Sequence, residues 1–140
     1  KQSEAFAYVD GSYDDTTKSY SYGMVMMHKD DELYFSKKFE KDDMSDMRNV
    51  AGEIEGSMAA MKYCIENGIK SISIFYDYEG IQKWCNGDWK AKKEGTKRYV
   101  KFYEDASKHV DVDFIKVKGH SGDKYIDLAD ELAKRALGLI

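Results

Sequence analysis

Two short apolar runs, 5–9 and 72–76, are each followed directly by an aspartate, Asp10 and Asp77. Each run is too short for a helix and is typical of a buried strand. A buried strand that ends in a carboxylate holds that carboxylate at the rim of a sheet. If the two strands are neighbours, two negative charges lie side by side, which is unfavourable unless a cation lies between them. Because carboxylate oxygens suit divalent ions, the pattern indicates a metal site at a sheet edge.

The size of the chain suits one domain, which we expect over residues 1–140, possessing a core of its own. The chain starts at Lys1 rather than Met, so we expect a domain excised from a longer protein. Cys64 and Cys85 lack metal-ligand spacing and are expected to be reduced thiols, with a disulfide as the minor alternative. No segment is typical of a signal peptide or a membrane span. We therefore expect a cytoplasmic monomer without a membrane partner.

Charge is unevenly spread along the chain. The formal net charge of -4 argues against a general nucleic-acid binder, which is usually basic. Acidic residues concentrate at 10–15 and 42–46, however, and a basic stretch follows later. That stretch contains Lys90, Lys92, Lys93, Lys97, Arg98 and Lys101. The sequence thus leaves room for a locally basic face on an acidic protein.

The hydrophobic pattern predicts an α/β fold with a mixed five-stranded sheet and helices on both faces. The polar turn 29–32 joins two of the predicted strands into a hairpin. In the first helix, Ile54, Met58, Met61 and Ile65 share one face, and Gly68 ends it. The predicted strands are 5–9, 20–28, 33–39, 72–76 and 112–117. The predicted helices lie near 53–67, 80–85, 100–106 and 128–137.

Four acidic residues lie at ends or faces of these elements that one sheet can bring together. Asp10 and Asp77 end strands, Glu53 opens the first helix, and Asp130 lies in the last helix with Asp127 one turn before it. Each has a purely structural alternative. The strand-end aspartates suit turns, Glu53 suits the helix dipole, and Asp127 and Asp130 suit a solvated face with Asp130 paired to Lys134.

The same residues resemble type 1 ribonuclease H over nearly the whole chain. Residues 8–12 read Tyr-Val-Asp-Gly-Ser, like the opening motif of that family, and Gly52-Glu53-Ile54 resembles its first helix. Asp77 corresponds to its third carboxylate. The most specific part is 117–122, Val-Lys-Gly-His-Ser-Gly, followed by Asp-Glu-Leu-Ala at 130–133.

The resemblance implies a ribonuclease H-like fold and an endonuclease that cuts the RNA strand of an RNA–DNA hybrid with two Mg²⁺ ions, for which Mn²⁺ substitutes. By analogy, Asp10 bridges both ions. Asp130 helps to hold the ion that activates water, and Glu53 and Asp77 help to hold the ion near the leaving group. Two cations of this kind stabilise the entering and leaving oxygens of a phosphodiester. His120 is expected to assist proton transfer or product release, and Asp127 to support the site.

Substrate contacts are also implied by the resemblance. Gly11, Ser12 and Asn49 are candidates for 2′-hydroxyl contacts, and Glu79 lies where many relatives carry glutamine. Trp84, Thr96 and Lys97 are candidates for the DNA strand. Asn49 has the alternative of a helix cap, and Trp84 that of a core residue.

Two other functions remain open on the sequence. One is a non-catalytic domain that binds the hybrid, and the other is a related metal-dependent DNA nuclease. The full-length chain is expected to carry an upstream hybrid-binding module.

Overall fold

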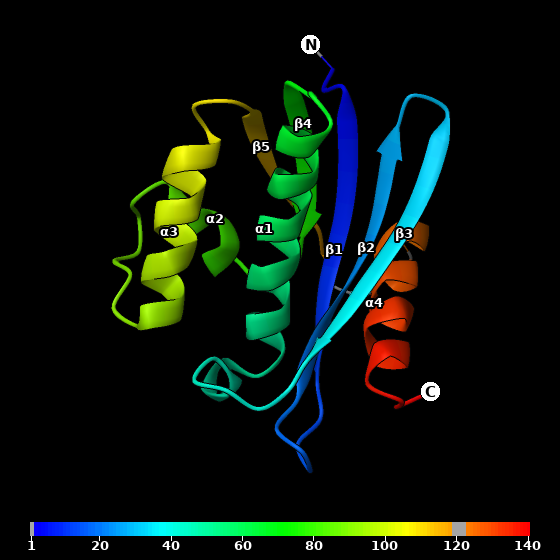
Figure 1. Ribbon diagram of the computed structural model, residues 1–140, viewed down its shortest axis with the longest axis vertical. Helices are drawn as coiled ribbons and strands as arrows, with labels where there is room; N and C mark the ends of the chain where they lie inside the picture. Colours follow the sequence, from blue (N-terminus) through cyan, green and yellow to red (C-terminus); the bar gives the residue numbers. More distant parts are fainter. Residues whose placement is uncertain (1, 119–122) are drawn as a thin grey trace.

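The computed structural model describes residues 2–118 and 123–140, and these form one five-stranded sheet in the order β3-β2-β1-β4-β5 (Figure 1). The first three strands are antiparallel, whereas β4 and β5 run parallel to β1. The strands are β1 (Ala5–Tyr13), β2 (Tyr20–His28), β3 (Asp31–Phe39), β4 (Ser71–Tyr76) and β5 (Asp111–Lys116). The predicted mixed sheet is confirmed.

Helices cover both faces of the sheet, as predicted. In Figure 1, α1 lies in front of the sheet with α2 and α3 beside it, and α4 lies behind. The helices are α1 (Asn49–Glu66), α2 (Gly80–Cys85), α3 (Glu94–Ala106) and α4 (Lys124–Ala136), with a short 3₁₀ turn η1 (Ser45–Met47). Successive side chains of β2 point to opposite faces of the sheet. Tyr22 lies against α1 on one face, and on the other face Ser21 Oγ donates to the carbonyl of Ala133 on α4 at 2.6 Å.

The core between α1 and the sheet is apolar. Val9, Ile54, Met61 and Ile74 are each 0% exposed. Burial of each such side chain stabilises the fold by about 1.5–3 kcal/mol. This packing fixes the strand ends on which the candidate site is built.

The predicted stripe on α1 is wrong at its last member. Ile65 is 43% exposed, because Cys64 and Ile69 fill the core at that end of the helix. The predicted helix end at Gly68 is confirmed, since α1 ends at Glu66, Asn67 is the C-cap residue and Gly68 follows with φ +68°.

The hairpin between β2 and β3 is tighter than predicted. The ladder continues to His28↔Asp31, so the turn is Lys29-Asp30 rather than 29–32. Lys29 at φ +59° supplies the positive φ that two-residue hairpin turns favour. Cys64 and Cys85 are both free thiols, as expected.

In the described part of the chain, no helix is long and apolar enough to cross a membrane.

Candidate functional site

Asp10 lies inside a strand rather than at its end, which corrects the sequence prediction. Antiparallel pairing with β2 carries β1 on to Tyr13 and places Asp10 opposite Gly23. Parallel pairing with β4 stops earlier, at Tyr8↔Phe75. Asp10 is therefore paired with β2 on one side, and on its other side β4 has already ended.

Gly23 allows α4 to approach Asp10. A Cβ atom at this position would lie 2.0 Å from the carbonyl oxygen of Ala129 and 2.7 Å from the backbone nitrogen of Ala133. The missing side chain thus permits contact between β2 and the backbone of α4. One result is that the carboxyl groups of Asp10 and Asp130 lie within hydrogen-bonding reach.

Glu53 reaches the same end of β4 from the other face of the sheet. Helix α1 begins at Asn49, so Glu53 lies in its second turn and does not open the helix. The residue is only 3% exposed. Its Oε2 accepts the backbone N–H of Asp77 at 2.9 Å, and its Oε1 accepts that of Tyr78 at 3.0 Å. Glu53 thereby fixes the chain where it leaves β4.

The acidic groups perturb one another. Burial raises the pKa of Asp10 to about 7, with the negative charges of Asp130 and Asp77 adding to it and the Gly11 N–H opposing it. Burial likewise raises the pKa of Glu53 to about 8, helped by the charges of Asp10 and Asp77 and opposed by the two backbone N–H groups. Carboxylates from β1, α1, α4 and the end of β4 therefore lie within electrostatic reach of Asp10. We call Asp10, Glu53, Asp77 and Asp130 the acidic cluster.

Lys134 is a basic side chain that reaches this cluster. Lys134 Nζ lies 3.0 Å from Asp130 Oδ2, and the hydrogen bond to Asp130 raises the pKa of Lys134. This is the ion pair that the structural alternative for Asp130 predicts, and it coexists with the contact to Asp10.

The cluster is not arranged around a single point. Among residues 2–118 and 123–140, no three His, Cys, Asp or Glu side chains converge closely enough to hold a metal ion. Glu53 directs both oxygens to backbone N–H groups, and Asp130 directs one oxygen to Lys134. The donor set nevertheless fits a hard divalent cation, because it consists of carboxylate oxygens and because burial, which raises the pKa values of Asp10 and Glu53, disfavours negative charge that a cation would offset.

The residues predicted to contact 2′-hydroxyl groups lie close to the cluster, but they differ in access. Gly11 is buried, and a Cβ there would lie 2.1 Å from the carbonyl oxygen of Asn49, so it permits the approach of α1. Ser12 is 7% exposed. Asn49 is exposed at the start of α1, where Arg48 is the N-cap residue, so the alternative of Asn49 as a helix cap is wrong.

Trp84 and Thr96 are buried. Trp84, which is 9% exposed, packs against Tyr78 and Trp89 with ring centroids 6.0 and 5.7 Å apart, as the core alternative predicts. Thr96 Oγ1 donates to the carbonyl of Lys93 at 3.0 Å and accepts its N–H at 3.1 Å. The threonine hydroxyl is therefore engaged in starting α3.

Charged candidates remain on the surface. Lys97 is exposed on α3. Glu79 Oε1 lies 2.7 Å from Lys83 Nζ, and the hydrogen bond from this lysine lowers the pKa of Glu79. Asp127 is exposed one turn before Asp130 on α4. His120 and its loop, 119–122, lie outside the described residues.

Tyr78 was not among the residues predicted from the sequence. Its backbone N–H binds Glu53 and its ring contacts Trp84 and Trp89, so it links the acidic cluster to an aromatic group. The available signal was its position, directly after Asp77 in the sequence.

The sequence is similar to that of known proteins over nearly its whole length. Residues 2–138 match the family profile described as RNase H. A ribonuclease H of Clostridium botulinum is 28% identical over 130 residues, which cover 84% of this chain and 82% of the relative. A ribonuclease H of a Wolbachia strain is 36% identical over 63 residues. That match spans 42% of this chain and 43% of the length of the Wolbachia protein.

Solved structures share the fold. LC11-RNase H1, solved in complex with an RNA/DNA hybrid, superposes with a TM-score of 0.73 at 16% sequence identity, covering 95% of this chain and 99% of that chain. At this identity the likeness concerns the fold.

Proposed function

This chain belongs to the ribonuclease H family, and we propose that it is an endonuclease that hydrolyses the RNA strand of RNA–DNA hybrids. The observation that carries the proposal is the meeting of Asp10, Glu53, Asp77 and Asp130 at one sheet edge. A domain that only bound a polyanion would gain nothing from acids at this edge beside the phosphates, least of all from the buried Asp10 and Glu53. The relative LC11-RNase H1, solved with an RNA/DNA hybrid, supports the choice of substrate.

We assign the acidic cluster to two divalent cations, Mg²⁺ in the first place and Mn²⁺ as a substitute. Bound there, such cations would supply charge stabilisation for the entering and leaving oxygens and would lower the pKa of a water molecule. The all-oxygen donor set supports this choice of metal.

The protein residues have separate tasks in this proposal. Asp10 and Asp130 approach each other from β1 and α4, so together they would hold cations at that side of the cluster. Glu53 holds the backbone of Asp77 and Tyr78 in place, and so determines where the Asp77 carboxylate projects. Release of the Glu53 carboxylate toward a cation would require these two N–H groups to find other acceptors. His120 is proposed to move a proton, and Asp127 to support Asp130.

Recognition of the hybrid would use two surfaces. Asn49, exposed at the start of α1, is proposed to contact the RNA strand with Ser12 and Gly11 beneath it. The exposed lysines around Lys97 would contact phosphates of the DNA strand. Trp84 and Thr96 would shape this surface from below, and Glu79 would reach the hybrid only by leaving Lys83.

The test is cleavage of a labelled RNA–DNA hybrid in Mg²⁺, beside single-stranded RNA, double-stranded RNA and double-stranded DNA. We expect cutting of the RNA strand of the hybrid, and its loss in Asp10→Asn. Asp113→Asn is the matched control, because it removes an exposed carboxylate on β5 outside the cluster.

Each other outcome selects a different function. Binding of the hybrid without cutting in Mg²⁺ or Mn²⁺ would identify a non-catalytic hybrid-binding domain. Cutting of DNA in preference to the hybrid would identify a metal-dependent DNA nuclease.

A further inference from the structure

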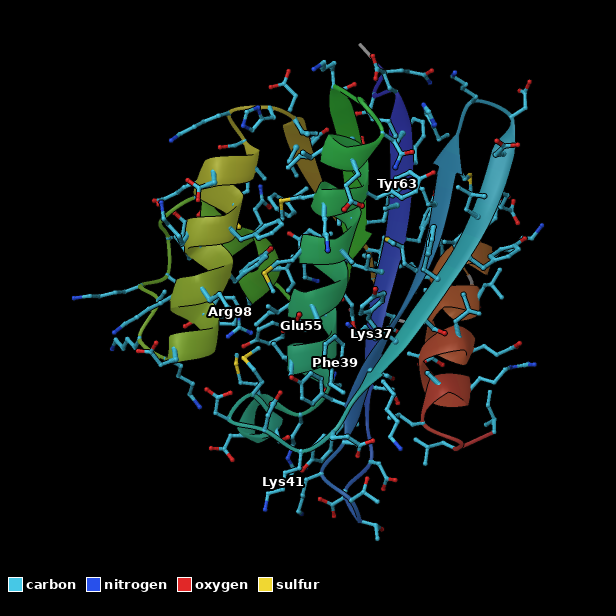
Figure 2. All side chains as sticks on the ribbon, viewed as in Figure 1. Lys37, Phe39, Lys41, Glu55, Tyr63 and Arg98 are labelled. Atoms are coloured by element: carbon cyan, nitrogen blue, oxygen red, sulfur yellow. The ribbon has the colours of Figure 1, made fainter. Side chains whose placement is uncertain are left out.

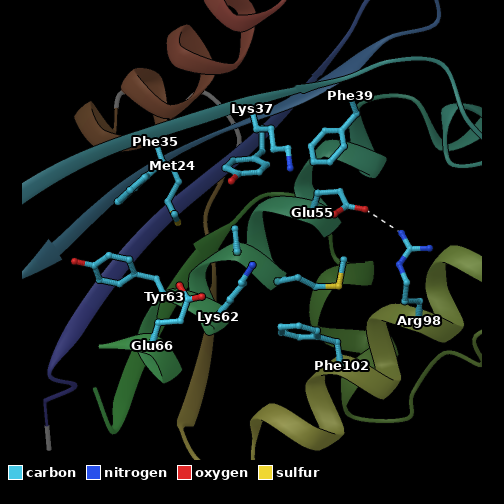
Figure 3. Close-up of a pocket in the computed structure, with 13 residues that line it drawn as sticks. Met24, Phe35, Lys37, Phe39, Glu55, Lys62, Tyr63, Glu66, Arg98 and Phe102 are labelled. Atoms are coloured by element: carbon cyan, nitrogen blue, oxygen red, sulfur yellow. Dashed lines mark hydrogen bonds and ion pairs between the residues drawn. The ribbon is translucent and has the colours of Figure 1, made fainter. Parts of the chain in front are cut away.

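A groove of about 430 Å³ opens between β3, α1 and α3 (Figures 2 and 3). It is separate from the acidic cluster. Glu55 lines the groove, whereas Glu53, two residues earlier on α1, meets the chain after β4. Residues two apart on a helix point to different faces. The groove therefore lies on another side of α1, where an occupant would leave the cluster open.

The floor of the groove is apolar and aromatic. Phe35 and Phe39 come from β3, Tyr63 and Met58 from α1, and Phe102 from α3. Phe35 and Tyr63 contact each other with ring centroids 5.5 Å apart. The four rings are only partly buried, so apolar surface faces solvent within a concave site. Such a floor favours an occupant that brings large apolar side chains.

The lining of the groove carries three cations, Lys37, Lys62 and Arg98, and two carboxylates, Glu55 and Glu66. Arg98 is paired with Glu55 at 3.0 Å, as the dashed line in Figure 3 marks. Lys37 and Lys62 stand on opposite sides, from β3 and α1, and among the described residues neither forms an ion pair. Lys37 Nζ lies 5.1 Å from the ring centroid of Phe39, so this cation borders the apolar floor directly. Two cations beside an apolar floor complement an anionic and apolar occupant.

We propose that this groove binds a short acidic peptide segment of a partner protein. One or two large apolar side chains of the segment would lie on Phe35, Tyr63 and Phe102, and flanking carboxylates would pair with Lys37 and Lys62. A nucleic-acid strand fits less well, because its successive phosphates would meet Glu55 and Glu66, which also line the groove, whereas a peptide can place a few carboxylates beside Lys37 and Lys62 alone. Peptide N–H groups, in contrast, can donate to Glu66. The partner would hold the protein while leaving the acidic cluster free for its substrate.

The experiment measures the binding of a fluorescein-labelled peptide that has two aspartates on each side of a Leu-Phe pair, by fluorescence polarisation at low salt. We expect saturable binding, weakened at least tenfold in Lys37→Glu and in Lys62→Glu. Lys108→Glu is the control, because it makes the same charge change after the end of α3, outside the lining of the groove. A second peptide with Ser-Ser in place of Leu-Phe is expected to lose binding by a similar factor. Cleavage of the RNA–DNA hybrid is expected to be unchanged in both lysine variants.

Several results would overturn the proposal. Equal binding of the Ser-Ser peptide, or equal weakening by Lys108→Glu, would indicate general attraction between charges. Displacement of the labelled peptide by a single-stranded oligonucleotide, with weaker oligonucleotide binding in Lys62→Glu, would assign the groove to nucleic acid. Absence of peptide binding to wild-type protein with normal circular dichroism would also reject it, whether or not the hybrid is cut.

Discussion

Glu53 Oε2 accepts the backbone N–H of Asp77 at 2.9 Å, so one acid of the cluster positions the backbone of another. This contact joins α1 to the end of β4 across the face of the sheet. It explains how a buried carboxylate with a pKa raised to about 8 is tolerated, because two backbone N–H groups partly offset the cost of its burial. The place of Asp77 therefore depends on Glu53 as well as on its own strand.

Asp10→Asn is expected to stabilise the metal-free protein at high pH. The folded-state pKa of Asp10, about 7, lies above its usual value of 3.8, so the folded state holds the proton more tightly than the unfolded state. In the wild type, the stability contributed by the protonated Asp10 carboxyl group is fully present below about pH 4 and is lost as the pH rises through about 7. Asparagine keeps the acceptor for the Gly11 N–H and can donate to Asp130. We expect a gain of about 1–3 kcal/mol at about pH 8.

Urea denaturation in a chelator, at about pH 4, 6 and 8, measures this effect. The advantage of Asp10→Asn should shrink toward low pH, whereas Asp113→Asn should follow the wild type throughout. A constant difference between Asp10→Asn and wild type at all three pH values would refute the explanation by titration.

Gly23→Ala is expected to displace α4 from β2. The new Cβ would lie 2.0 Å from the carbonyl oxygen of Ala129, and a helix backbone cannot yield as a flexible side chain does. Overpacking of this kind costs about 1–3 kcal/mol. Because the shift moves Asp130 away from Asp10, we expect hybrid cleavage to fall more than stability does. Gly56→Ala is the comparison, since its Cβ would lie 3.0 Å from Tyr22 Cβ, a smaller clash on the face of the sheet away from α4, so stability should fall without displacement of Asp130.

A combined assay of thermal unfolding and hybrid cleavage tests Gly23→Ala. Wild-type cleavage in a destabilised Gly23→Ala protein would show that the approach of α4 does not control the geometry of the cluster.

The proximity of Asp10 and Asp77 was predictable from the sequence, but the details of their placement were not. Asp10 and Asp77 follow apolar runs whose period reports burial, and this signal is local. The length of β1 is set instead by its pairing with β2 on one side and β4 on the other. The position of Asp10 within the strand therefore depends on two distant segments, which the residues around Asp10 do not reveal. The exposure of Ile65 has the same origin, because Cys64 and Ile69 fill the core at that end of α1.

The groove was unpredictable for a related reason. Its floor combines Phe35, Tyr63 and Phe102 from three elements that are distant in the sequence. Each residue alone fits a core-facing position in its own strand or helix. Their partial exposure follows from how far β3 and α3 stand apart over α1, which is a property of the packed fold.

Lys134→Met is expected to strengthen binding of Mg²⁺. Lys134 Nζ lies 3.0 Å from Asp130 Oδ2 and competes for the same oxygen as a cation in the cluster. Removal of this charge should lower the half-saturating Mg²⁺ concentration about two- to tenfold, as expected for one partly screened charge near the site. Isothermal titration with Mg²⁺ measures it, beside Arg135→Met, which removes a charge paired to Glu131 on the same helix. Equal effects of both variants would indicate general electrostatics rather than competition at Asp130.

Thr96→Val is expected to destabilise the start of α3. The Thr96 hydroxyl both donates to the Lys93 carbonyl and accepts its N–H, and valine keeps the shape while removing both bonds from a residue that is 2% exposed. Loss of a helix cap of this kind costs about 0.5–2 kcal/mol. Thr96→Ser is the control, because it retains the hydroxyl. In denaturant unfolding, wild type and Thr96→Ser should be more stable than Thr96→Val. Because Lys97 lies in the same helix turn, Thr96→Val should also bind the hybrid more weakly than wild type and Thr96→Ser. If Thr96→Ser were as unstable as Thr96→Val, the methyl group of Thr96 rather than its hydroxyl would account for the loss.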